Sequence, residues 1–232
     1  MLPRLASECG IILHLSSLRR WLRRLGSCWK RGRRSLKPQR DAAAFAACQQ
    51  QLRPLHRAEG RGEVAVVYVE ECRFSRQAPV PDAWQVRGLP PVGLPAVRGS
   101  GGHSVLGFWR AGVAGQPLTA YCRAGALTAD LFVLAVDEFS QTLSGPTVLV
   151  LDNASIHKAH LVRARHQEWA ARGLTLLFLP PYSPELNKIE VLWHRCKHYW
   201  VRPEDYLTDQ TLLERVDYVL QRVGTTYTIT FK

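Results

Sequence analysis

The segment 148–193 constrains the fold of this chain more than any other part of its sequence. Its β-branched and aliphatic runs at 147–152 and 174–179 indicate two buried strands, and the stretch between them, at about 158–172, has helical periodicity. A proline-rich turn and a further helix at about 187–200 follow. A strand, a helix and a second strand in this order predict two parallel strands joined by a crossover, and therefore part of an α/β sheet.

Three further strands are predicted upstream of this segment. The apolar runs that indicate them lie at 64–69, 104–112 and 117–125. The last two are joined by a short glycine-containing stretch, which is typical of a hairpin turn. Helices are predicted at 128–143, with Thr128 as the cap, and at about 208–222. We therefore expect an α/β fold with a mixed sheet of three antiparallel strands plus two parallel strands, flanked by helices.

The positive charge of the chain is concentrated in its first quarter. Residues 1–62 carry 14 Lys and Arg against 3 Asp and Glu, a net charge of +11, whereas residues 63–232 carry a net charge of +1. This asymmetry indicates a polyanionic partner, because neutralised phosphates release counterions. A solvated basic face is the alternative. We expect a DNA-binding partial helix-turn-helix and linker at 1–62, and a catalytic domain at 63–232.

An amphipathic helix is predicted near the N-terminus, beginning at Ser16 or Ser17 and ending before Gly26. Its polar face resembles that of a recognition helix, and a second helix is predicted at 41–58, with Pro54 disturbing its end. Since the residues before this helix are too few for the preceding helices of a complete helix-turn-helix, we expect the chain to begin inside a DNA-binding domain. The side chains predicted to contact DNA are Arg19, Arg20, Arg23, Arg24, Lys30, Arg31, Arg33 and Arg34.

Carboxylates stand where two predicted strands end. Glu70 follows the run 64–69 directly, and Asp152 closes the run 147–152. If these strands are neighbours, the two acids meet, and Glu190 in the helix after the proline turn supplies a third oxygen donor for Mg²⁺ or Mn²⁺. Each acid also has a structural alternative. Asp152 fits an Asx turn, and Glu190 fits a capping box with Asn187.

Two sequence blocks carry a specific resemblance. VLVLDNASIHKAH and LPPYSPELNKIEVLW resemble the second and third catalytic blocks of the IS630/Tc1/mariner superfamily of DDE transposases. The likeness extends upstream to VVYVEECRF, SVLGFWRAG and LRRWLRRLGSCWKRGRR, and so covers most of the chain. It implies an RNase H-like core in which two metal ions are held by Glu70, Asp152 and Glu190. Accessory roles are implied for Glu71, Asn153, His157 and Asn187.

The first acid departs from the family pattern, which has Asp-Glu where this chain has Glu70-Glu71. The extra methylene moves the carboxylate by about 1 Å, and an error of that size can lower a rate about a hundredfold. Octahedral Mg²⁺ tolerates such displacement poorly.

The resemblance implies a transposase that cuts DNA at element ends and joins the freed 3′ hydroxyl to target DNA. It also implies a homodimer on DNA, in the bacterial cytoplasm and associated with the nucleoid. A catalytically impaired, truncated remnant that only binds DNA is the alternative, and an RNase H-like nuclease of another role is a third.

Other classes of protein and site are less compatible with the sequence. No apolar run is long enough to span a bilayer, and no signal-peptide pattern opens the chain, so we expect no membrane partner. The six cysteines are scattered without a CxxC pair. The histidine pairs His157/His160 and His194/His198 raise a zinc alternative, but no thiolate accompanies them, and we expect carboxylate-bound Mg²⁺ or Mn²⁺ instead.

Overall fold

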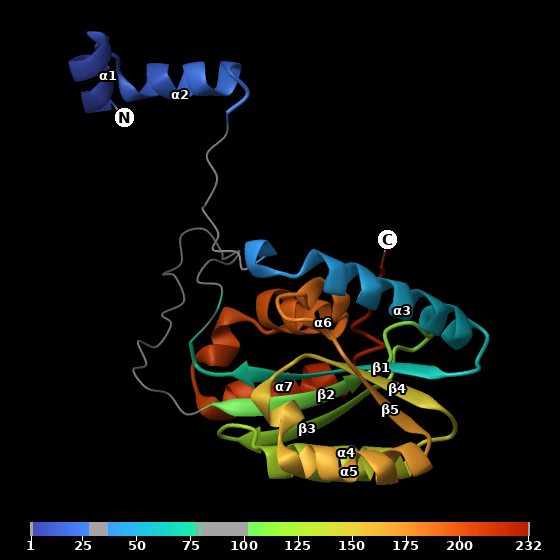
Figure 1. Cartoon of the computed structure of the whole chain (residues 1–232). Helices are drawn as coiled ribbons and strands as arrows, with labels where there is room; N and C mark the ends of the chain where they lie inside the picture. Colours follow the sequence, from blue (N-terminus) through green and yellow to red (C-terminus); the bar gives the residue numbers. More distant parts are fainter. Residues whose placement is uncertain (1, 28–36, 78, 80–101, 232) are drawn as a thin grey trace. The chain divides into compact units, whose positions relative to one another are not determined.

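The computed structural model describes residues 2–27, 37–77, 79 and 102–231, and the chain divides into two compact units, Met1–Leu36 and Lys37–Lys232 (Figure 1). The division lies earlier than the predicted boundary at 62/63. The reason is α3 (Ala42–Gly60), which packs Cys48 and Leu52 into the core beside the sheet. The functions assigned to the two parts stay predictions.

The first unit contains two helices in its described part. α2 (Leu15–Arg24) is the predicted amphipathic helix, but its cap is His14 rather than Ser16 or Ser17. The His14 ring accepts a hydrogen bond from the Ser16 backbone N–H at 3.4 Å. α1 (Leu2–Cys9) lies in the ten residues for which no helix was expected.

The four arginines of α2 are exposed, as a DNA-contacting face requires: Arg19, Arg20, Arg23 and Arg24. The other four predicted contacts lie outside the described residues: Lys30, Arg31, Arg33 and Arg34. On the apolar side of α2, Leu18 is buried, whereas Trp21 and Leu25 are exposed. The predicted apolar face is therefore only partly covered within this unit.

The second unit begins with the 3₁₀ turn η1 (Lys37–Gln39) and the long helix α3. Asp41 caps α3 by accepting hydrogen bonds from the backbone of Ala43 at 2.8 Å and Ala44 at 3.0 Å. Pro54 lies inside this helix rather than near its end, and the helix continues to Gly60. The missing proline N–H removes one backbone bond, which the packing of the helix on the sheet tolerates.

The sheet has the strand order β3-β2-β1-β4-β5, which confirms the predicted mixed sheet. β1 pairs antiparallel with β2, and β2 with β3, whereas β1–β4 and β4–β5 are parallel. The strands are β1 (Ala65–Phe74), β2 (His103–Trp109), β3 (Leu118–Ala124), β4 (Thr147–Leu151) and β5 (Leu174–Phe178).

β1 is longer than predicted. The run 64–69 suggested a strand that ends at Glu70, but β1 continues through Glu70 and Glu71 to Phe74 because β2 pairs with it over this whole length. Its pairing with β4 ends at Val69. The sheet therefore has a step, at which β4 stops and β1 continues.

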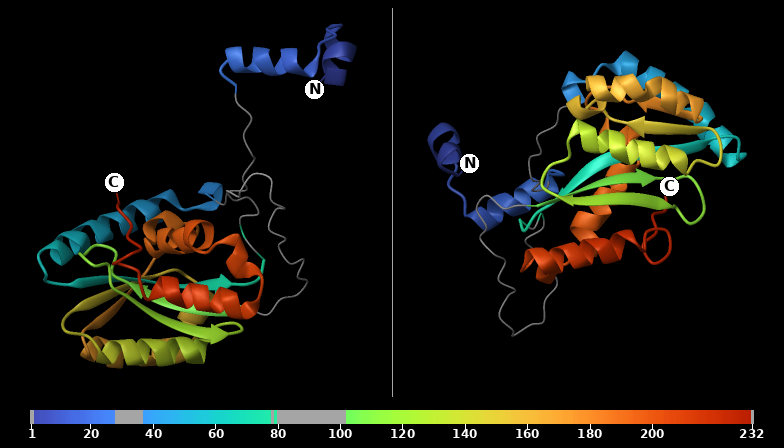
Figure 2. Two further views of the ribbon diagram at one scale, coloured as in Figure 1. Left: turned by 180° about the vertical axis from the view of Figure 1, so that it is seen from behind. Right: turned by 90° about the horizontal axis from the view of Figure 1, so that it is seen from below.

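Helices cover both faces of the sheet, as Figures 1 and 2 show. One face packs against α4 and α5 and the other against α3, α6 and α7, each with its own buried apolar cluster. None of the described helices is long and apolar enough to cross a membrane. The remaining elements are α4 (Ala129–Gln141), η2 (Ser155–Lys158), α5 (His160–Ala171), η3 (Pro184–Leu186), α6 (Ile189–Arg195), the π-helical turn η4 (Cys196–Trp200), η5 (Pro203–Tyr206) and α7 (Asp209–Leu220).

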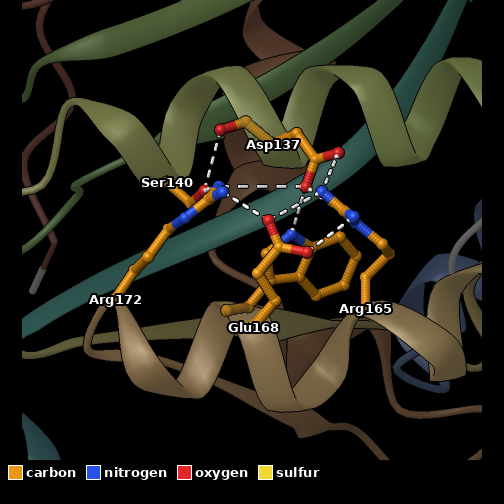
Figure 3. A network of polar contacts seen from close by, with 6 residues as sticks. Asp137, Ser140, Arg165, Glu168 and Arg172 are labelled. Atoms are coloured by element: carbon orange, nitrogen blue, oxygen red, sulfur yellow. Dashed lines mark hydrogen bonds and ion pairs between the residues drawn. The ribbon is translucent and has the colours of Figure 1, made fainter.

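A polar network joins α4 to α5 (Figure 3). Asp137 of α4 accepts hydrogen bonds from the buried Trp169 indole at 2.6 Å and from Arg165 at 2.8 Å. Arg172 donates to Ser140 at 2.7 Å and also contacts Glu168. The network fixes the crossover helix α5 on α4, and so helps to hold β4 and β5, which α5 connects.

Gly107 allows α6 to lie close to the sheet. It faces Glu70 across the β1–β2 ladder. A Cβ atom at Gly107 would lie 2.6 Å from Trp193 Cζ2 and 3.1 Å from the Ile189 side chain, both on α6. A larger residue would therefore push α6 away from the sheet.

We predict that Gly107→Ala lowers the free energy of unfolding by about 1–3 kcal/mol, because the added methyl group overpacks the α6 contact. Chemical denaturation measures this change. Gly145→Ala is the matched control, since a Cβ there would meet no atom within 4 Å. Equal stability of the two variants would contradict the prediction.

Candidate active site

The β1–β4 register brings the first two predicted acids together. Val69 pairs with Leu151 at the end of the parallel ladder, and Glu70 and Asp152 each follow by one residue. Side chains alternate between the faces of a strand, so both carboxylates point to the face covered by α6. Glu71 belongs to the opposite face, which α4 and α5 cover.

Glu190 reaches the same place from α6. The chain leaves β5, turns through the prolines and η3, and enters α6 at Ile189. Asn153 donates a hydrogen bond to the Leu179 carbonyl, which ties the chain after β4 to the chain after β5. Ile189 and Leu192 anchor the other face of α6 in the core, so Glu190 in the first turn is directed away from it.

The three acids line one cavity of about 270 Å³. Its wall is completed by the segment that follows β5. The lining residues are Glu70, Asp152, Asn153, Ala154, residues 179–184, Asn187 and Glu190. Two of the predicted accessory residues, Asn153 and Asn187, are therefore in the wall, whereas Glu71 and His157 are not.

The cavity concentrates negative charge. Burial, followed by the neighbouring Glu190 and Asp152 carboxylates, raises the pKa of Glu70 to about 9, and the Lys197 ammonium opposes this rise. The pKa of Asp152 is lowered, chiefly by its hydrogen bond with His157. One acid is thus kept ionised while its neighbour resists ionisation, which is the expected behaviour of crowded carboxylates. A bound cation would relieve this repulsion.

His157 positions Asp152. It is buried, and its Nδ1 lies 2.8 Å from Asp152 Oδ1. Its ring packs against Phe132 of α4 with the centroids 4.5 Å apart. The Ala154 backbone N–H donates to the same carboxylate oxygen at 3.0 Å. Asp152 therefore forms the Asx-type turn proposed as its structural alternative and lines the cavity at the same time.

Asn187 does not cap α6, so the capping box predicted with Glu190 is wrong. The N-cap of α6 is Lys188, and it makes no side-chain capping bond. Instead the buried Asn187 amide donates to Glu70 Oε2 at 3.1 Å and approaches the Val69 carbonyl at 3.5 Å. Its Oδ1 is buried without a hydrogen-bond partner. The amide N–H of Asn187 thus donates to the buried carboxyl group of Glu70, and its oxygen does not accept from the backbone N–H groups at the start of α6.

The donor chemistry of the cavity fits a hard divalent cation. Three carboxylates from three elements and the unpartnered Asn187 Oδ1 are the oxygen donors that Mg²⁺ and Mn²⁺ take. Within the described residues, no three or more His, Cys, Asp and Glu side chains lie close enough to hold an ion as they stand.

The histidines considered as zinc ligands make different contacts. His157 contacts Asp152, whereas His194 and His198 stack on each other with their ring centroids 4.4 Å apart. His157 takes part in the carboxylate site rather than joining a histidine cluster.

The sequence matches two family models. Residues 65–213 match the DDE superfamily endonuclease model, more than half of the chain, and residues 4–52 match a winged helix-turn helix model. The chain belongs to the DDE superfamily endonucleases. The second match covers α1, α2 and the first part of α3, and agrees with the helix-turn-helix character expected near the N-terminus.

Solved structures share the fold of this DDE endonuclease. The Mos1 transposase paired-end complex with left transposon end is 15% identical, with 96% of this chain and 72% of that chain covered and a TM-score of 0.55. The Mos1 mariner paired end complex with Mn is 14% identical, with 98% and 74% covered and a TM-score of 0.54. The corresponding complex with Mg is also 14% identical, with 99% and 75% covered and a TM-score of 0.54.

These identities establish likeness of fold alone, and they confirm the expected RNase H-like sheet. A search of curated protein sequences found no match.

Three features of the endonuclease site were missed by sequence reasoning. Gly107 lies within a strand, and an internal strand glycine is a signal of close approach that was available. Tyr182 lines the cavity with φ of 57°, a left-handed backbone that a bulky residue rarely adopts. Lys197, within electrostatic reach of Glu70, lies in the π-helical turn η4, a conformation that has no sequence signal here but is frequent at functional sites.

Metal binding can be tested without a DNA substrate. We predict that Mn²⁺ raises the melting temperature of the endonuclease and that Glu190→Gln abolishes the increase, because the cavity loses a charged oxygen donor. Differential scanning fluorimetry over a Mn²⁺ titration measures this effect. Glu138→Gln, which removes an exposed acid of α4, is the control and should keep the full increase. An increase that survives in Glu190→Gln would rule out this cavity as the metal site.

Asn187 offers a second test. We predict that Asn187→Ala weakens Mn²⁺ binding roughly 10–100-fold, as the loss of a group that orients a metal ligand does, because Glu70 loses its hydrogen-bond donor. Isothermal titration calorimetry gives the affinity, and circular dichroism checks that the variant is folded. Unchanged affinity in a folded variant would show that Asn187 has no positioning role.

Proposed function

We propose that the protein is a DNA transposase whose catalytic residues are Glu70, Asp152 and Glu190. The observation that carries the proposal is the shared cavity: acids from β1, the end of β4 and α6 line one space in a chain of the DDE superfamily endonucleases. Phosphodiester chemistry requires oxygen donors that converge in this way. Mg²⁺ or Mn²⁺ is the proposed cofactor, and similar Mos1 structures contain each of these metals.

DNA is the proposed partner, both as element ends and as target. The exposed arginines of α2 and the +11 net charge of residues 1–62 suit contacts to backbone phosphates. A homodimer on DNA is part of the proposal, supported by the similar fold of Mos1 transposase, whose structures include paired-end complexes. The proposed location is the bacterial cytoplasm, at the nucleoid.

The proposed reaction has two steps. Water attacks the phosphorus at the element end, the bond from phosphorus to the 3′ oxygen breaks, and a 3′ hydroxyl is released. That hydroxyl then attacks a target phosphodiester and displaces the target 3′ oxygen. A divalent cation held by the three acids would supply Lewis-acid activation of the attacking oxygen and stabilisation of the leaving oxygen.

The residues of the chain prepare this site. His157 and the Ala154 N–H hold the Asp152 carboxylate in one orientation. Asn187 holds one oxygen of Glu70, whose extra methylene would otherwise leave the carboxylate with more freedom than the aspartate of the family pattern. The anchored core face of α6 fixes the position of Glu190. Such positioning, rather than proton transfer by these residues, is what the geometry supports.

A nicking assay tests the proposed activity. We predict that the chain nicks supercoiled plasmid DNA in the presence of Mn²⁺, and that Glu190→Gln lowers the rate at least about a hundredfold, because the loss of a catalytic group has at least the effect of misplacing one. Glu70→Asp restores the usual family acid and is expected to cut faster. Agarose-gel conversion of supercoiled to open-circular plasmid measures the rates, with Glu138→Gln as the control.

The same assay separates the rival function. If the natural chain does not nick DNA and Glu70→Asp does, the protein is a DNA-binding remnant whose first acid is misplaced. Equal nicking by the natural chain and Glu190→Gln would contradict the proposed catalytic set.

A further inference from the structure

A cluster of cations and aromatic rings lies on α6, on η4 and just after it. Between positions 191 and 202 the sequence contains three Lys and Arg residues and no Asp or Glu. Most of the side chains concerned are exposed, and Lys197 is half-buried. The α6 surface, as we name it, consists of His194, Arg195, Lys197, His198, Tyr199 and Arg202.

The rings of the α6 surface are ordered against one another. His194 and His198 stack with centroids 4.4 Å apart, and the Arg195 guanidinium lies 4.9 Å from the centre of the Tyr199 ring. Tyr199 is nevertheless 62% exposed. A large ring that is braced by a cation and still exposed offers a face on which a further planar group can stack.

The cations of the α6 surface form no ion pair with an acid of the described residues. Among the described residues, no acid forms an ion pair with Arg195, Lys197 or Arg202, whereas nearby Arg215 lies 3.5 Å from Asp205. The surface is therefore complementary to an anion. Its rigidity comes from the other side of the helix, where Leu192 and Cys196 are buried, and from Arg215, which donates two hydrogen bonds to the Trp200 carbonyl.

The α6 surface adjoins the cavity. Glu190, His194 and His198 follow one another at intervals of four residues, so a line along one side of the helix leads from the cavity to the stacked imidazoles. Lys197 extends from η4 towards β1, with its ammonium 5.7 Å from the centre of the Phe74 ring. Burial and Glu190 raise the pKa of Glu70, and the Lys197 charge opposes that rise.

We propose that the α6 surface binds an unpaired stretch of the DNA strand that flanks the phosphate held in the cavity. Arg195 and Lys197 contact backbone phosphates, and a base stacks on Tyr199. Alternating cations and rings match the alternation of phosphates and bases in a single strand. An acidic peptide would satisfy the cations but not the rings. This inference rests on the proposed function, since it places the strand beside the catalytic acids.

The chain contains a matched control. Arg222, which follows the end of α7, lies over the ring of Tyr218 of α7 at 3.7 Å, and Tyr218 is 42% exposed. This pair has the same chemistry as Arg195 and Tyr199, but it does not lie on the helix that carries Glu190. Substitutions of Arg222 and Tyr218 therefore report what the loss of an arginine–tyrosine pair away from α6 does to DNA binding.

Fluorescence anisotropy with a fluorescein-labelled thirty-nucleotide oligo-dT tests the proposal on the full chain. Arg195→Ala combined with Lys197→Ala should lower the slope of log Kd against log salt by about 1.4, or about 0.7 for each phosphate contact. Tyr199→Ala should weaken binding about tenfold, while Tyr199→Phe keeps the ring and the affinity. Arg222→Ala and Tyr218→Ala should change the salt slope and the oligo-dT affinity no more than an ordinary surface substitution does. Circular dichroism checks that all variants are folded.

Two results would overturn the proposal. One is that the α6 and α7 variants have equal effects on oligo-dT binding. The other is that neither set of variants changes oligo-dT binding, while a poly-glutamate peptide binds more tightly to the α6 surface. Failure of the proposed function can be told apart from failure of this inference. If the proposed function fails, the natural chain does not nick plasmid DNA, whatever its affinity for oligo-dT. If nicking depends on Glu190 but oligo-dT affinity is insensitive to the α6 variants, the function stands and this surface is excluded.

Discussion

The parallel pairing of β1 with β4 places two mutually repelling carboxylates side by side, because each acid follows the last paired residue of its strand. The other contacts of the site hold these two carboxylates in place. Asp152 is held by His157 and a backbone N–H, and Glu70 by the Asn187 amide. The backbone hydrogen bonds between β1 and β4 keep the two acids close together, although their charges repel each other.

The third acid depends on a different kind of contact. Glu190 is placed by packing, because α6 lies on the sheet only where Gly107 leaves room for Trp193. On the far side of the sheet, Asp137 and its partners hold the crossover helix α5 on α4 (Figure 3). The acids therefore lie on elements that are held in place by packing on both faces of the sheet. Such support keeps like-charged side chains close together.

The sequence predicted the mixed sheet well, because buried strands have strong apolar patterns. The three acids that it singled out line one cavity, and their catalytic role stays a prediction. The sequence predicted side-chain partners poorly. Asn187 satisfied the spacing of a capping box, but its partner proved to be Glu70, which is distant in the sequence and near only in the fold. The end of β1 was misplaced for a related reason: its last residues include polar side chains, and only pairing with β2 keeps them in a strand.

The step in the sheet also governs how a long polymer can approach. β1 forms the back of the cavity and α6 one side, while the rest of the wall comes from the segments after β4 and β5. A space of about 270 Å³ admits a phosphate group but not a double helix, whose major groove alone is about 12 Å wide. In the transposase proposed above, a duplex at this corner would therefore present one backbone phosphate at a time to the cavity.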